Sequence, residues 1–184
     1  MDKQQNPENA FVRQLQLLRS AEQMLTNTMT GMIRKATNFG LKKSLEFHLA
    51  ETHQHKTASD AICKQLEVDA IGETNEVLRA LIEEGEQQVG TKNAGDAFHA
   101  AIIKAAVKIE QYDIEEYEKA AELAMQYGHD FVAARLSLTQ QEEKQAQTKL
   151  KFEKKGFRIN SFSLHLCKLE TCGRPIRPGP PDPI

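Results

Sequence analysis

Four long stretches of this sequence repeat apolar residues at the three-four spacing of an amphipathic helix, and a glutamate interrupts each apolar stripe. These glutamates are Glu22, Glu51, Glu110 and Glu143. A helix in a bundle buries its apolar stripe against its neighbours, so the four carboxylates are expected inside the protein. A buried, unpaired charge is costly, and the four groups therefore need protons or a cation between them. The pattern predicts an all-α bundle with a polar centre.

The order of the predicted helices indicates a particular topology. Helices are expected over about 7–35, 41–66, 94–127 and from 130 onward, with a short amphipathic segment near 75–88. The turn at 38–40 and Gly128, which suits a left-handed helix cap, each close a helical hairpin. Two hairpins joined by a long connection are typical of a ferritin-like four-helix bundle, here with an extra short helix in the crossover. Residues 1–156 are predicted to form this single domain.

The four glutamates are predicted to lie at one depth in the bundle. Glu22 and Glu51 stand about 16 and 13 residues from the first hairpin turn, and Glu110 and Glu143 about 18 and 15 from the second. At a rise of about 1.5 Å per residue, each pair differs in depth by only about 4 to 5 Å. All four carboxylates can therefore meet at one level.

Carboxylates gathered in this way suit a pair of metal ions, because bridging acids hold two cations together and offset their repulsion. Ferritin-like di-iron and di-manganese proteins use one Glu from each of two helices and a Glu-x-x-His pair from each of the others. The standard histidines are absent here, since Gln54 follows Glu51 and Ala146 follows Glu143 at that spacing.

Other residues near the glutamates can complete the site. His48 lies three residues before Glu51 and His55 four after it, so either histidine can reach a shared site, and His55 is preferred. Asp113 stands one helical turn after Glu110. We therefore predict two ions of iron or manganese, held by Glu22, Glu51, His55, Glu110, Asp113 and Glu143. A metal-free polar layer is the alternative.

Charge and composition indicate which partners and which cellular location to expect for the chain. The net charge is −2, with acids and bases interspersed, so a broad basic field for nucleic acid is not expected. No run approaches the roughly 20 apolar residues of a membrane span, and no signal-type segment opens the chain, which favours a cytoplasmic protein. Residues 157–184 hold five of the six prolines and are predicted to form a non-helical tail. An extension added in cloning or by a frame shift is an open alternative for this tail.

Short motifs around the four glutamates carry a resemblance to a known family. They are Ser20-Ala21-Glu22-Gln23, His48-Leu49-Ala50-Glu51-Thr52, Lys108-Ile109-Glu110-Gln111-Tyr112-Asp113-Ile114 and Glu142-Glu143-Lys144. In their order and spacing, over about residues 8–155, the chain resembles the YciE/YciF-type ferritin-like stress-protein family of bacteria. The resemblance implies a ferritin-like bundle, usually dimeric, with a di-metal centre and a link to stress responses. We accordingly expect a homodimer.

Two functions follow as hypotheses. The first is a di-iron or di-manganese carboxylate protein, and so an oxidoreductase of ferroxidase or peroxidase-like type that reacts with oxygen or peroxide. The second is a non-enzymatic, dimeric helical scaffold that binds partners and keeps a vestigial metal site.

Overall fold

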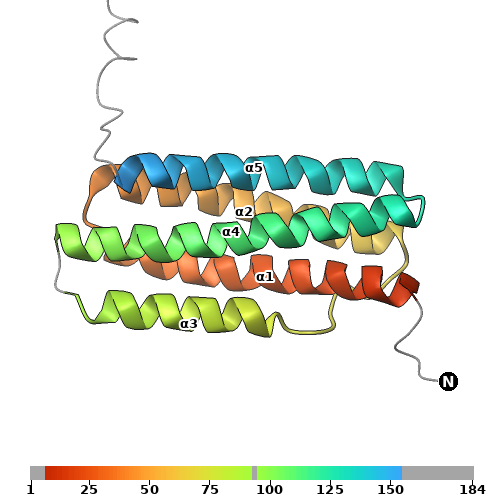
Figure 1. The fold of residues 1–184 in the computed structure, drawn as a ribbon, viewed down its shortest axis with the longest axis horizontal. Coiled ribbons are helices and arrows are strands. Elements are labelled where there is room, and N and C mark those ends of the chain that lie inside the picture. The colour runs from red at the N-terminus through yellow and green to blue at the C-terminus, as the bar shows by residue number, and fades with distance from the viewer. Residues whose placement is uncertain (1–6, 93–94, 155–184) are drawn as a thin grey trace, which may run out of the picture.

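Five helices make up the regular structure of the described part of the protein (Figure 1). The computed structural model describes residues 7–92 and 95–154. The helices are α1 (Pro7–Lys35), α2 (Phe39–Gln65), α3 (Glu76–Gly90), α4 (Asp96–Gln126) and α5 (Asp130–Lys154).

Local capping residues decide where several of these helices begin and end. The Asn38 side chain accepts a hydrogen bond from the Leu41 N–H at 2.9 Å, so α2 begins at Phe39, two residues earlier than predicted. Asn75 caps the first turn of α3 in the same way. Gly128, between α4 and α5, has a φ of 74°, which confirms the predicted left-handed cap.

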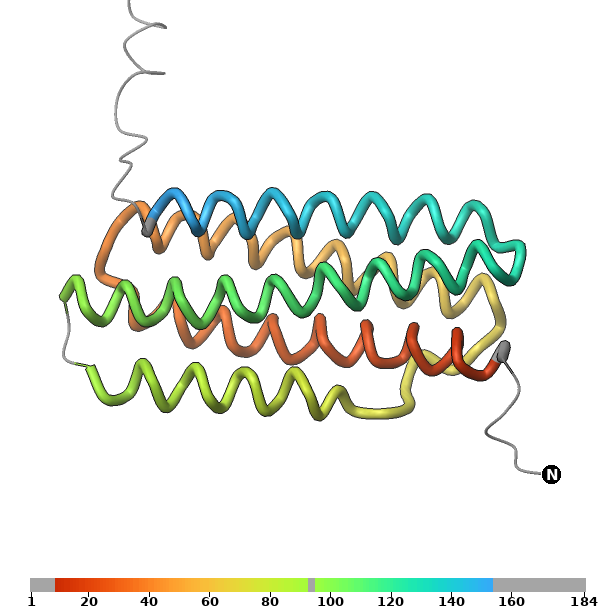
Figure 2. The backbone as a smooth tube through the Cα atoms, viewed as in Figure 1, coloured from red at the N-terminus to blue at the C-terminus, as the bar shows by residue number. Residues whose placement is uncertain are grey.

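The four long helices form an antiparallel bundle whose chain directions can be followed in Figure 2. Helix α1 contacts α2 and α4, and α5 contacts the same two helices from the other side. Helix α3 runs back along the outside of the bundle, where it packs against α4 and α1 (Figure 1). This confirms the predicted ferritin-like four-helix bundle with a long crossover that carries a short extra helix.

Hydrophobic clusters lie on both sides of the predicted polar level. One cluster includes Phe11, Leu15 and Leu18, which come before Glu22 along α1. A second cluster is built largely from the start of α2, the start of α4 and the end of α5, with Leu41, Leu45, Ile102, Ile103 and Leu150 among its members. Apolar packing therefore encloses the middle of the bundle and keeps bulk water from the side chains there.

The predicted tail lies outside the described residues, which end at Lys154, the last residue of α5. None of the described helices combines the length and the apolar character that crossing a bilayer requires.

Candidate metal centre

A layer of buried acidic and imidazole groups occupies the middle of the bundle. Each of the four long helices contributes to it, and each of the six residues is at most 5% exposed. The layer contains Glu22 from α1, His48 and His55 from α2, Glu110 and Asp113 from α4, and Glu143 from α5.

The first candidate ligand group joins α1, α2 and α5. Glu22, His55 and Glu143 each offer one ligand atom, and the three atoms lie within 4.8 Å of one another. The Nδ1 atom of His55 is 2.7 Å from Oε1 of Glu143 and 3.9 Å from Oε1 of Glu22. The hydroxyl of Tyr117, which is buried on α4, donates a hydrogen bond to the same Glu22 oxygen. This leaves the second oxygen of Glu22 free for another partner.

The second candidate group joins α2, α4 and α5. It consists of His48, Glu110 and Glu143, again with ligand atoms within 4.8 Å of one another. The Nε2 atom of His48 is 3.0 Å from Oε1 of Glu110 and 3.6 Å from Oε2 of Glu143. Glu143 therefore belongs to both groups, with one carboxylate oxygen beside His55 and the other beside His48. A carboxylate placed in this way can bridge two ions.

Two predicted ligands lie next to these groups rather than within them. Asp113 is fully buried, and neither of its carboxylate oxygens has a hydrogen-bond partner among the described residues. The side chain of Glu51 is 21% exposed and lies at the rim of the layer. Its Oε2 is 3.6 Å from Nδ1 of His48, and its Oε1 is 3.7 Å from Nζ of Lys149. The structure therefore brings together Glu22, His55, Glu110 and Glu143 and places the other two beside them.

Both histidines of α2 reach the layer, whereas the sequence left the choice between them open and favoured His55. They are seven residues apart, so they project from nearly the same side of the helix, two turns from one another. Each histidine therefore serves a different ligand group. The sequence signal for this arrangement is the two-turn spacing of the histidines. Such a spacing favours two neighbouring ligand groups over two alternative ligands of a single group.

Burial and mutual repulsion disfavour negative charge on most of the acids in the metal-free protein. Burial, and then the charge of Glu143, raises the pKa of Glu22 from 4.5 to about 8. Burial likewise raises the pKa of Glu110 to about 7, although His48 opposes the shift. The pKa of Asp113 is raised well above its usual value by burial and by the charges of Glu22 and Glu143.

Glu143 and the two histidines shift in the direction of charged forms. Burial alone would raise the pKa of Glu143, but the nearby imidazoles of His55 and His48 outweigh burial and lower it. Burial alone would lower the pKa of each histidine, yet Glu110 raises that of His48 and Glu143 raises that of His55. Near neutral pH and without metal, these shifts favour the charged form of Glu143 and the protonated forms of both histidines, and they favour the protonated forms of Glu22 and Asp113.

Unpaired polar atoms show that the layer fits metal ions. Among the described residues, ten buried side-chain nitrogen and oxygen atoms have no hydrogen-bond partner. All ten belong to Glu22, His48, Glu51, His55, Glu110, Asp113 and Glu143. Folded proteins rarely leave such atoms unpaired, and clusters of them are explained by unplaced ligands, water or ions. Carboxylate oxygen together with imidazole nitrogen is a donor set that suits iron, manganese or zinc.

Two further residues lie at the site and were not among the predicted ligands. Tyr117 lies on the same helix as Glu110, and from its position on the apolar stripe it was expected either to be core or to support the site; its hydroxyl donates a hydrogen bond to Glu22. Glu142 precedes Glu143 on α5, and its Oε2 lies 3.0 Å from Nε2 of His55. Glu142 was not predicted to face the core, and the packing of α2 against α5 brings it to His55.

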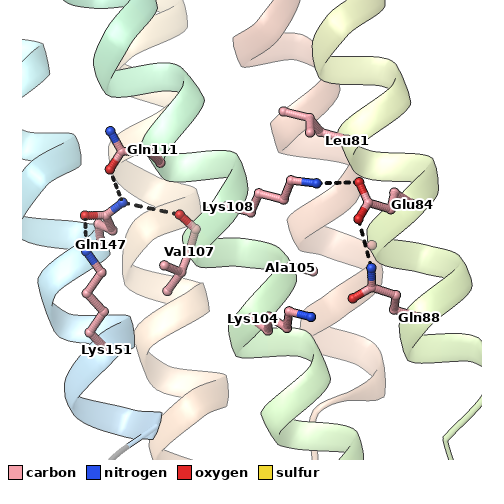
Figure 3. A pocket seen from close by; sticks show the side chains of 11 residues that line it. Leu81, Glu84, Gln88, Lys104, Ala105, Val107, Lys108, Gln111, Gln147 and Lys151 are labelled. Atoms are coloured by element: carbon pink, nitrogen blue, oxygen red, sulfur yellow. Dashed lines mark hydrogen bonds and ion pairs between the residues drawn. The ribbon is translucent and has the colours of Figure 1, made fainter.

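A surface groove elsewhere on the bundle does not take part in this chemistry. It has a volume of about 470 Å³ and lies between α3 and α4, with part of α5 along its edge (Figure 3). Lys108 crosses the groove to Glu84, and Gln147 hydrogen-bonds to Gln111 and to the Val107 carbonyl. The described residues that line it include no member of either ligand group. Enclosed polar atoms, rather than the size of this groove, identify the candidate site.

Comparison with known proteins agrees with this architecture. Residues 6–153 match the family described as "Domain of unknown function (DUF892)". The protein YciF of Escherichia coli strain K12 is 32% identical over 144 residues, which cover 78% of this chain and 87% of YciF. The crystal structure of YciF, described as an E. coli stress protein, superimposes with a TM-score of 0.76 over 91% of this chain and 99% of that one, at 27% identity. The structure of YcfI from Rhodopseudomonas palustris has a TM-score of 0.78 at 30% identity, over 82% of this chain and 98% of that one.

The match to the family covers most of the chain, so this protein belongs to the DUF892 family and is of the YciF type.

Proposed function

We propose that this member of the DUF892 family binds two divalent metal ions, iron or manganese, in the middle of its helical bundle. The observation that carries the proposal is the pair of buried ligand groups that share Glu143. Glu22 and His55 complete one group, and His48 and Glu110 complete the other. A single carboxylate common to two neighbouring groups is the arrangement that a pair of ions requires.

The charges of the layer agree with two divalent ions. Four fully enclosed carboxylates, those of Glu22, Glu110, Asp113 and Glu143, face one another at the centre of the bundle. Two divalent cations would offset these four negative charges while both histidines remain neutral ligands. In the metal-free protein, bound protons reduce the same repulsion. They nevertheless leave ten buried atoms without hydrogen-bond partners, which is a cost that bound ions would remove.

Each side chain has a distinct part in holding the ions. Glu143 stands between the two groups, and Tyr117 fixes one oxygen of Glu22 while the other remains available. Asp113 has two unpaired oxygens beside the groups and is an additional ligand in this proposal. Glu51, at the rim, retains one unpaired oxygen and can reach toward the side of His48. All six ligands predicted from the sequence, with His48 added, therefore have a place in the proposed centre.

Bound iron or manganese would supply electron-transfer chemistry toward oxygen or peroxide, which is the oxidoreductase activity proposed here. The protein side chains bind and orient the ions, and the apolar clusters on both sides limit the access of water. A role in protection against oxidative stress follows from that chemistry.

Metal analysis of untagged protein tests the proposal directly. After anaerobic loading with Fe(II) or Mn(II) and removal of free metal, we expect two ions per chain. Glu143→Gln should remove most of this binding because it alters both groups, whereas Glu122→Gln, at an exposed position of α4, should leave it unchanged. Wild-type protein that retains no more metal than a buffer control would refute the proposal and favour the non-enzymatic scaffold.

A further inference from the structure

His55 is connected to the protein surface through a contact that neither ligand group includes. Its Nε2 atom lies 3.0 Å from Oε2 of Glu142, a side chain of α5 that is 34% exposed. The same Glu142 oxygen is 3.8 Å from a guanidinium nitrogen of Arg135, which lies seven residues earlier on α5, about two helical turns away. A continuous series of polar contacts therefore leads from the buried layer through His55 and Glu142 to Arg135 at the surface.

The two ring nitrogens of His55 have different surroundings. Nε2 has a hydrogen-bond partner in Glu142, whereas Nδ1 has none and faces Glu143 and Glu22. A carboxylate can only accept, so the hydrogen bond requires a proton on Nε2. A neutral imidazole with its proton on Nε2 has its lone pair on Nδ1, which is the atom that points into the first ligand group.

The position of Glu142 next to Glu143 lets the two side chains reach different sides of the His55 ring. Glu142 and Glu143 are consecutive on α5, so their side chains leave the helix about 100° apart. One side chain reaches the buried group and the other reaches the outer edge of the same imidazole. The ring of Tyr117 lies edge-on to His55, with centroids 6.3 Å apart, and limits rotation of the imidazole on another side.

We propose that Glu142 is a positioning residue that holds His55 with Nε2 outward and Nδ1 directed at the first ligand group, and that Arg135 steadies Glu142. This inference rests on the proposed function, because it assigns how one ligand of that centre is oriented. Metal-bound histidines are commonly held in this way by a carboxylate on their second nitrogen.

His48 provides an internal comparison. Its Nδ1 atom is 3.6 Å from Oε2 of Glu51, and neither of its ring nitrogens makes a hydrogen bond to a described residue. Glu142 contacts His55 and not the second group, so loss of Glu142 should weaken one ion and spare the other. A general loss of folding would not produce this asymmetry.

The test is a calorimetric titration of the full chain with Mn(II). In Glu142→Ala we expect one of the two ions to bind about 10- to 100-fold more weakly, with the other unchanged. Glu142→Gln keeps an acceptor oxygen and should recover part of the loss. Glu118→Ala, which removes an exposed glutamate of α4, should bind both ions as the wild type does.

A second readout follows the imidazole itself. In ¹⁵N-labelled protein loaded with Zn(II), long-range ¹H–¹⁵N correlation should show His55 protonated at Nε2 and metal-bound at Nδ1. The resonances are assigned by their loss in His55→Gln. In Glu142→Ala the Nε2 proton should exchange faster with water, because its acceptor has been removed.

Several results would overturn the inference. Equal affinities in Glu142→Ala and wild type, equal weakening of both ions, or metal bound at Nε2 of His55 would each do so. If wild-type protein binds two ions and Glu142→Ala behaves identically, only the role of Glu142 is lost. If wild-type protein binds none, the proposed function fails together with this inference.

Discussion

The metal-free protein should lose stability as the pH rises from about 6 to 9, because buried acids must then give up their protons. The pKa of Glu22 is raised from 4.5 in the unfolded chain to about 8 in the folded protein. The unfolded chain therefore releases this proton first. The stabilisation that protonated Glu22 provides is complete below pH 4.5. It is lost as the pH rises through the pKa of Glu22 in the folded protein, about 8.

The expected size follows from the linkage between proton binding and folding. Between about pH 6 and pH 9, Glu22 removes about 3 kcal/mol from the free energy of unfolding, and Glu110, with its pKa raised to about 7, removes about 1 kcal/mol. His48 and His55 act in the same direction, because their raised pKa values mean that their stabilisation is lost as they deprotonate. Glu143, with its lowered pKa, loses its contribution only in acid, below this range.

Urea denaturation in the presence of a chelator measures this dependence. Wild-type stability should fall by at least about 4 kcal/mol across the range, because Glu22 and Glu110 account for that much and Asp113 and the two histidines act in the same direction. In Glu22→Gln the fall should be smaller by about 3 kcal/mol, because the amide cannot ionise. The same variant should also bind metal more weakly, because it replaces a proposed ligand carboxylate with an amide. A wild-type stability that is constant or that rises between these pH values would refute the reasoning.

Four other substitutions test the packing and capping. Tyr117→Phe removes the hydrogen bond to Glu22 and should lower the free energy of unfolding by about 1 to 3 kcal/mol, measured by denaturation of the metal-free protein. Gly85→Ala places a methyl group 2.9 Å from an alanine methyl of α4 and should cost about 1 to 3 kcal/mol, whereas Gly31→Ala, with nothing within 4 Å, should gain about 0.5 to 1 kcal/mol. Asn38→Ala removes the cap of α2 and should lower the free energy of unfolding by about 1 kcal/mol, which a lower melting temperature would show. An unchanged melting temperature in Gly85→Ala would contradict the close contact between α3 and α4.

Much of the fold could be predicted because its signals are local. Hydrophobic periodicity gave four long helices, and Gly128 and the residues around Asn38 marked the hairpin turns within a few positions. The long connection between hairpins restricted the topology to a bundle with one crossover. Counting residues from each turn also placed Glu22, Glu110 and Glu143 at a common depth, since the rise of a helix is constant.

The details of the site depended on how the helices are rotated against one another. The buried side of α2 centres on His48, Thr52 and His55, and Glu51 lies far enough around the helix to reach the rim. A pattern that spans half of a helix surface cannot distinguish these positions, because a rotation of about 60° exchanges centre and edge.

The sequence by itself therefore determined the helices, their order and the set of acidic and imidazole groups that the bundle must bury. Only the tertiary structure decided that Glu143 is shared by two ligand groups and that each histidine serves a different one. It also decided that Glu142, which was not among the predicted ligands, contacts His55. The reason is that periodicity constrains each helix separately, whereas a ligand group is defined by distances between atoms of different helices, which depend on their packing.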